Sequence, residues 1–142
     1  MGFQEITSNV PLWAAMISWA IAQGTKIVLT LFIERRFDAT RIVGTGGMPS
    51  SHSALVMAIT FSVGKYNGFA SPLFAVALIF SFVVMYDAAG IRRAAGKQAE
   101  ILNMLIVKHQ LPDMEKVKEL LGHTPLEVFV GGILGIVVGL WV

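Results

Sequence analysis

Residues 46–53, with the sequence GGMPSSHS, combine two glycines, three serines and a histidine in one short turn. The glycines allow close approach of the backbone to a ligand, and a serine-rich helix start presents backbone N–H groups to an anion. A histidine beside them can donate a proton near neutral pH. The turn is therefore suited to hold a phosphate next to a proton donor. The alternative is that Ser50, Ser51 and Ser53 only cap a helix.

A second polar segment, residues 123–128 (HTPLEV), places a histidine four positions before Glu127. The same residues fit a capping box, because Thr124 and Glu127 have the required spacing and Pro125 suits the first helical position. The glutamate can close a helix start, serve a site, or do both. For His123, as for His52, the alternative is an interfacial polar residue without a catalytic role.

A third polar segment, residues 86–93 (YDAAGIRR), contains one acid and two arginines. For Asp87 we favour a salt bridge with Arg92 or Arg93. Assistance to a site and cation binding are the alternatives.

The composition indicates a membrane environment for these segments. Hydrophobic residues make up 55% of the 142 residues and charged residues 14%, whereas soluble domains have about 25% charged residues. The absence of cysteine excludes disulfides and thiolate metal sites. A net charge of +2 is too small to suggest a nucleic-acid partner.

Four apolar segments, residues 11–33, 53–64, 68–89 and 124–142, can form transmembrane helices. The second is short for a crossing unless its helix begins at Pro49. We predict an all-α integral membrane bundle of about four transmembrane helices.

Between residues 94 and 122 the apolar positions repeat at the spacing of amphipathic helices. Residues 111–113 (LPD) break the pattern in two, with Asp113 as an N-cap and Gly122 as a stop. We predict an inserted helical hairpin on the membrane surface or over the site, within a single domain of residues 1–142.

Threading four crossings through the chain brings the polar junctions together. The first crossing ends near Arg35, the second begins near His52, the third ends near Arg92 and the fourth begins near His123. All four lie on one membrane face, with Lys65 in the opposite loop. By the positive-inside rule that face is cytoplasmic, and both termini lie on the other side. The basic residues on this face are Arg35, Arg36, Arg41, Arg92, Arg93, Lys97, Lys108, Lys116 and Lys118.

Lys26 stands in the middle of the first apolar segment. A charge there is costly, which favours a functional role, with snorkelling to the interface as the alternative. Arg35, Arg36 and Arg41 are equally consistent with topology anchors, lipid headgroup contacts and catalytic groups.

The three polar segments together resemble a known superfamily. Residues 49–52 (PSSH) resemble the Pro-Ser-Gly-His motif of the type 2 phosphatidic acid phosphatases, a superfamily that includes vanadium-dependent haloperoxidases. Residues 123–128, followed by Gly131, resemble its closing motif. With residues 86–93, the pattern is similar to a divergent branch of small membrane proteins, over most of the chain from about Gln23.

The resemblance implies metal-independent hydrolysis of a phosphomonoester or diphosphate, without a cofactor. His123 would be the nucleophile that forms a phosphohistidine, and Glu127 would orient its imidazole. His52 would protonate the leaving oxygen. The phosphate-binding residues implied are Lys26, Arg35, Ser50, Ser51, Arg92 and Arg93, with Asp87, Gly47 and Arg36 in support.

The chain departs from the superfamily pattern at several positions. The arginine expected seven residues after Lys26 falls on Ile33, so that either Arg35 or Arg36 would have to serve. Ser51 replaces a glycine, Glu127 replaces an aspartate, and the arginine pair precedes His123 by about thirty residues instead of about six.

Three functions are compatible with these observations. The first is a phosphatase acting on a lipid such as phosphatidylglycerol phosphate, phosphatidic acid or a polyprenyl diphosphate, presented from the cytoplasmic leaflet. The second is a lipid-phosphate binding or translocating protein without turnover, and the third is a vanadate-dependent oxidation enzyme. A homodimer is a further expectation, because four crossings are fewer than the membrane members of this superfamily usually have.

Overall fold

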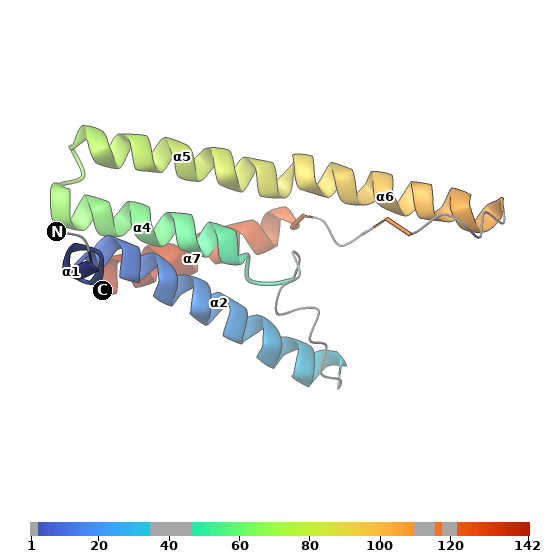
Figure 1. Ribbon diagram of the computed structural model, residues 1–142, viewed down its shortest axis with the longest axis horizontal. Coiled ribbons are helices and arrows are strands. Elements are labelled where there is room, and N and C mark those ends of the chain that lie inside the picture. Colours follow the sequence, from blue (N-terminus) through green and yellow to red (C-terminus); the bar gives the residue numbers. More distant parts are fainter. Residues whose placement is uncertain (1–2, 35–46, 110–115, 118–121) are drawn as a thin grey trace.

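The structure is a computed structural model that describes residues 3–34, 47–109, 116–117 and 122–142. Within these ranges every regular element is a helix and no strand occurs, which confirms the predicted all-helical fold. The helices, shown in Figure 1, are α1 (Phe3–Thr7), α2 (Val10–Glu34), α4 (Ser51–Asn67), α5 (Pro72–Ala89), α6 (Ile91–Lys108) and α7 (Pro125–Trp141).

Hydroxyl side chains define where three of these helices begin. Ser50 caps α4, Ser71 caps α5 and Thr124 caps α7, each from an extended backbone conformation. Each side-chain oxygen accepts a hydrogen bond from the backbone N–H three residues later, which satisfies one of the donors that a helix start leaves open. A proline follows the cap in α5 and α7, where its missing N–H costs nothing.

Among the described residues, two long helical stretches are apolar enough to cross a membrane. They are Val10–Phe32, of 23 residues, and Pro72–Lys108, of 37 residues, which joins α5 to α6. Helix α7 is a shorter apolar helix. The four predicted apolar segments thus coincide with α2, α4, α5 and α7, while the number of crossings stays a prediction.

Helix α4 lies in the middle of the bundle, packed against α2, α5 and α7 (Figure 1). Hydroxyl side chains at its buried contacts form hydrogen bonds between the helices. Ser18 of α2 donates to the carbonyl of Ala54 at 3.1 Å, and Thr60 contacts Ser81 of α5 at 2.7 Å between hydroxyl oxygens. Hydrogen bonds of this kind hold helices together in lipid, where apolar burial contributes little. They also explain why α4 is less apolar than its neighbours.

Helices α4 and α7 approach each other most closely along a row of small residues. A Cβ atom added to any of three glycines of α7 would come within 2.4 Å of a backbone carbonyl oxygen of α4 or of its N-cap. For Gly131 that oxygen belongs to Ser50, which it would meet at 2.3 Å. The spacing between the two helices is therefore set by the missing side chains of Gly131, Gly135 and Gly139.

We expect Gly135→Ala to destabilise the bundle by about 1–3 kcal/mol, the usual cost of overpacking. The added methyl would lie 2.4 Å from the Ala54 oxygen and 2.9 Å from the Ala58 nitrogen, both backbone atoms that cannot move alone. Thermal unfolding of the detergent-solubilised protein measures the effect. Gly24→Ala in α2 is the matched control, because nothing lies within 4 Å of its added methyl. Equal stability of the two variants would contradict this packing.

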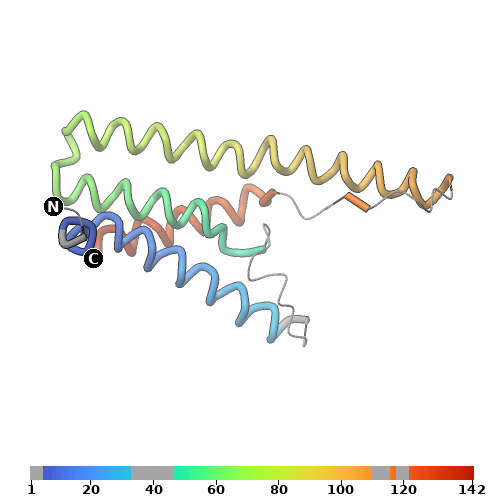
Figure 2. Tube along the Cα trace, viewed as in Figure 1, coloured from blue at the N-terminus to red at the C-terminus, as the bar shows by residue number. Residues whose placement is uncertain are grey.

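The amphipathic insert differs from the predicted hairpin. Helix α6 continues the direction of α5 away from the bundle, instead of lying across the site (Figures 1 and 2). Lys116 and Val117, which fall in the predicted second helix, are not helical. The side chain of Asn103 donates to the Val117 carbonyl at 2.7 Å and accepts from its N–H at 2.8 Å. These bonds satisfy the backbone of Val117 without a helix, so the prediction of a helix is wrong at these two residues. The break at residues 111–113 lies outside the described residues.

The ends of the helices fall into two groups. Helix α1 and the last turn of α7 lie at one end of the bundle, while α4 and α7 begin toward the other end, where α5 passes into α6 (Figure 1). The polar junctions around His52, Arg92 and His123 therefore share one end, as the threading of the crossings requires. The cytoplasmic assignment of that end stays a prediction.

Candidate functional site

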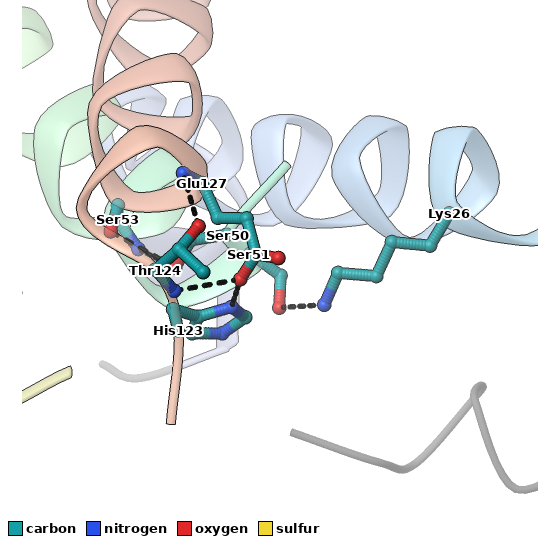
Figure 3. A network of polar contacts seen from close by, with 7 residues as sticks. All are labelled: Lys26, Ser50, Ser51, Ser53, His123, Thr124 and Glu127. Atoms are coloured by element: carbon teal, nitrogen blue, oxygen red, sulfur yellow. Dashed lines mark hydrogen bonds and ion pairs between the residues drawn. The ribbon is translucent and has the colours of Figure 1, made fainter. Parts of the chain in front are cut away.

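His123 is held by the first turn of α7. Its Nδ1 lies 3.1 Å from Oε2 of Glu127, and the same oxygen accepts the backbone N–H of Thr124 at 3.0 Å (Figure 3). The Thr124 hydroxyl accepts the N–H of Glu127 in return, which completes a capping box. The two explanations of Glu127 therefore coexist, because one carboxylate caps the helix and contacts the imidazole.

The other ring nitrogen of His123 is left without a partner. Nε2 is buried and makes no hydrogen bond within the described part of the chain, and the residue as a whole is only 3% exposed. A carboxylate can only accept, so a neutral imidazole beside Glu127 carries its proton on Nδ1 and a lone pair on Nε2. Buried polar atoms are nearly always satisfied, so this nitrogen calls for a functional explanation.

The protonation of His123 is governed by its surroundings. Burial lowers the pKa of the imidazole, and the positive charges of Lys26 and Arg92 act in the same direction. The hydrogen bond to Glu127 and its negative charge oppose this effect without overcoming it. The pKa lies below its ordinary value of 6.5, so His123 is predominantly neutral at pH 7.

Backbone contacts join His123 to the segment that contains the arginines. The His123 N–H donates to the carbonyl of Ala88 at 3.0 Å. Gly122 has a φ of +101°, and an added Cβ atom would lie 2.4 Å from the nitrogen of Arg93. Only glycine tolerates both the left-handed backbone and this approach. The fold therefore closes the gap of about thirty residues between the arginines and His123.

Arg92 is the arginine of this pair whose charge acts on both His52 and His123. Its Nε donates to Oδ2 of Asp87 at 2.6 Å, so the structure contains the salt bridge favoured for that aspartate. The side chain of Arg93 is exposed.

The serine turn is joined to α7 by its backbone. The N–H of Ser50 donates to the carbonyl of Glu127 at 3.0 Å, at the place where Gly131 allows close contact. The buried Ser50 hydroxyl accepts from the N–H of Ser53 at 3.4 Å and from its hydroxyl at 3.0 Å. Ser50 is thus a helix cap in this structure, and its own hydroxyl proton has no acceptor among the described residues. Gly47 has a φ of +83°, which favours glycine.

Lys26 reaches from α2 to the start of α4. Its Nζ donates to the hydroxyl of Ser51 at 3.2 Å (Figure 3), and the residue is only 4% exposed. The lysine is therefore directed into the protein rather than snorkelling to the interface. Its charge also acts on His52, His123 and Glu127.

His52 occupies the first turn of α4 and is exposed. Its imidazole interacts electrostatically with Arg92, His123 and Lys26. Four residues predicted for the site therefore come together: Lys26 from α2, His52 from α4, Arg92 from α6 and His123 from the start of α7. Arg35 and Arg36, together with Arg41 and Gly46, lie outside the described residues.

Some groups that form this arrangement cannot be recognised from the types of residue in the sequence. The Ala88 carbonyl and the Glu127 carbonyl act through the backbone, which any residue could supply. Gly122 is the exception, because an isolated glycine directly before His123 is a recognisable sign of a special backbone conformation. Among the described residues, no group of three His, Asp or Glu side chains is placed to hold a metal ion.

The chain resembles known proteins at the level of its family and of its whole sequence. The model of the Divergent PAP2 family matches residues 7–138. The chain is 39% identical over 150 residues to the "uncharacterized membrane protein YuiD" of Bacillus subtilis, and the match covers 96% of this chain and 95% of that protein. No solved structure matches the chain significantly. The family match supports the resemblance to type 2 phosphatidic acid phosphatases and leaves the haloperoxidase relation a prediction. The chain is thus a membrane protein, and it belongs to the Divergent PAP2 family.

Proposed function

We propose that this protein is an integral membrane lipid phosphatase that works through a phosphohistidine, without a metal ion. The observation that carries the proposal is the buried Nε2 of His123, which lacks a partner among the described residues while Glu127 holds Nδ1. The membership in a PAP2-related family supports the same chemistry.

In the first step, Nε2 of His123 attacks phosphorus and an N–P bond forms as the bond to the lipid oxygen breaks. His52 donates a proton to that leaving oxygen, which departs as an alcohol or, from a diphosphate, as a monophosphate. In the second step water attacks phosphorus, the N–P bond breaks, and His52 takes the proton from water. Glu127 stabilises the positive charge that the imidazole acquires in between.

Positive charge around Nε2 stabilises the phosphoryl group as it passes through the transition state. Lys26 and Arg92 supply it, and both already act electrostatically on His123. The hydroxyls of Ser50 and Ser51 and the first N–H groups of α4 bind phosphoryl oxygens at a helix start. Arg35 or Arg36 adds a further positive charge.

The membrane environment supports a lipid substrate. The site lies at one end of a bundle whose α5 exposes large apolar side chains, among them Val76, Ile79 and Phe80. We propose that the substrate is a lipid phosphate or polyprenyl diphosphate with its headgroup at this end and its chain beside the helices. The site faces the cytoplasm, both termini face the other side, and residues 1–142 form one domain.

A panel assay tests this function. Detergent-solubilised protein is incubated with phosphatidic acid, phosphatidylglycerol phosphate and a polyprenyl diphosphate, and released phosphate is measured with and without vanadate. We expect turnover of at least one lipid, inhibition by vanadate, and no requirement for a divalent metal when EDTA is present. Stoichiometric lipid binding with no release from any of these lipids would instead identify a lipid-phosphate binding or translocating protein.

A further inference from the structure

Asp87 and Arg92 form an ion pair at the junction of α5 and α6. Oδ2 of Asp87 lies 2.6 Å from Nε of Arg92, and the two side chains are 33% and 45% exposed, respectively. Exposed ion pairs of this kind contribute about 0–1 kcal/mol to stability. Stability is therefore a weak explanation for this ion pair. Its position relative to the site suggests a role in the site instead.

Backbone contacts connect both residues of the pair to the site. Ala88, the neighbour of Asp87, accepts the N–H of His123 at 3.0 Å. Gly122 packs against the backbone of Arg92, where an added Cβ atom would come within 2.7 Å of the Arg92 carbonyl carbon. The backbones that carry the carboxylate and the guanidinium are thus both fixed relative to the imidazole.

The nitrogen of Arg92 that binds Asp87 determines which donors of the guanidinium are left for a ligand. Arginine has five N–H donors, and the bond to Asp87 uses the one on Nε. Within the described part of the chain the two Nη atoms make no hydrogen bond, so their four N–H donors remain for another acceptor. Because a guanidinium is a planar fork, holding Nε also fixes the direction in which the Nη atoms point.

We propose that Asp87 is a positioning residue, which holds Arg92 so that its Nη groups bind the phosphoryl oxygens at Nε2 of His123. This inference rests on the proposed function and names a residue through which the site is preorganised. A negative charge near a phosphate is otherwise unfavourable, so its presence beside Arg92 requires a compensating gain in geometry.

The test measures phosphate release and vanadate binding for Asp87→Ala, Asp87→Glu and the wild type. We expect Asp87→Ala to lower kcat by about 10-fold to 100-fold, with a smaller change in KM, and to weaken vanadate binding by about tenfold. Asp87→Glu keeps the carboxylate and should recover most of both. In an Arg92→Ala background, Asp87→Ala should change kcat by less than about twofold, because Asp87 acts through Arg92. Glu100→Gln, an exposed acid of α6, is the control and should match the wild type.

The sign of the vanadate effect decides between two roles. If Asp87 acts only as a nearby negative charge, Asp87→Ala tightens vanadate binding, and the proposal is overturned. It is also overturned if Asp87→Ala impairs the Arg92→Ala background as strongly as the wild type, which would show a general loss of structure. A wild type that binds vanadate and releases no phosphate defeats the proposed function, while the binding comparison still decides the role of Asp87.

Discussion

We expect replacement of His123 to abolish phosphate release, with a fall in kcat of about 10⁴-fold or more. The reason is that Nε2 is the atom that bonds to phosphorus, and nothing else can replace a lost nucleophile in a covalent mechanism. Release of phosphate from the best lipid of the panel measures the effect. His109→Ala is the matched control, because His109 is an exposed histidine at the C-terminal cap of α6.

Two variants separate chemistry from folding. His123→Ala removes both ring nitrogens, and with them the contact to Glu127. His123→Asn keeps a side-chain N–H that can reach that carboxylate but offers no nucleophilic nitrogen. Both should be inactive, and His123→Asn should unfold at a temperature close to that of the wild type.

Direct detection of the intermediate completes this experiment. Brief incubation of the wild type with lipid labelled in its phosphate, followed by denaturation in alkali, should leave label on the protein, because phosphohistidine is stable to base and labile to acid. Neither His123 variant should retain label. Full activity of His123→Asn, or label on both variants, would disprove the mechanism.

The fold could be predicted largely because apolar patterning in a membrane leaves few choices. The four apolar segments and the caps at Ser50 and Thr124 are local features, and α4, α5 and α7 begin near the positions that they indicate. The helix predicted through Lys116 and Val117 is wrong at these two residues, because amphipathic spacing carries no information about a competing hydrogen-bond partner. Asn103 binds the backbone of Val117 and replaces the bonds that a helix would have made.

The residues of the candidate site could be proposed from the sequence, but their geometry could not. Three motifs identify the histidines and the arginines, because their side chains have the required chemistry, and Lys26 is identified by its charge within an apolar segment. Their approach depends on Gly122 and Gly131, which act by having no side chain, and on a carbonyl of Ala88. Neither effect can be read from one motif alone, since each is a contact between two segments far apart in the chain.

The second large effect concerns Glu127, and it separates the two roles that its carboxylate combines. We expect Glu127→Ala to lower kcat by about 10²-fold to 10⁴-fold, because the imidazole loses the group that orients it and stabilises its positive charge. The substitution also removes half of the capping box, at a cost of about 1 kcal/mol in stability. Thr124→Ala removes the other half, since the Thr124 hydroxyl accepts from the N–H of Glu127 at 3.3 Å. It leaves the carboxylate beside His123 and should keep most of the activity.

The pH profile gives an independent readout of the same pair. In the wild type, burial lowers the pKa of His123 below 6.5, and Glu127 opposes that shift by its hydrogen bond and its charge. Because the nucleophile must be neutral, activity should fall on the acid side only below pH 6.5. Glu127→Gln removes the opposing charge, so the pKa of His123 falls further and the acid limb of kcat/KM, which reports the free enzyme, moves to lower pH, although kcat itself is reduced. Thr124→Ala should leave that limb in place. If Thr124→Ala instead loses as much activity as Glu127→Ala, with no shift of the limb in Glu127→Gln, capping alone explains the glutamate.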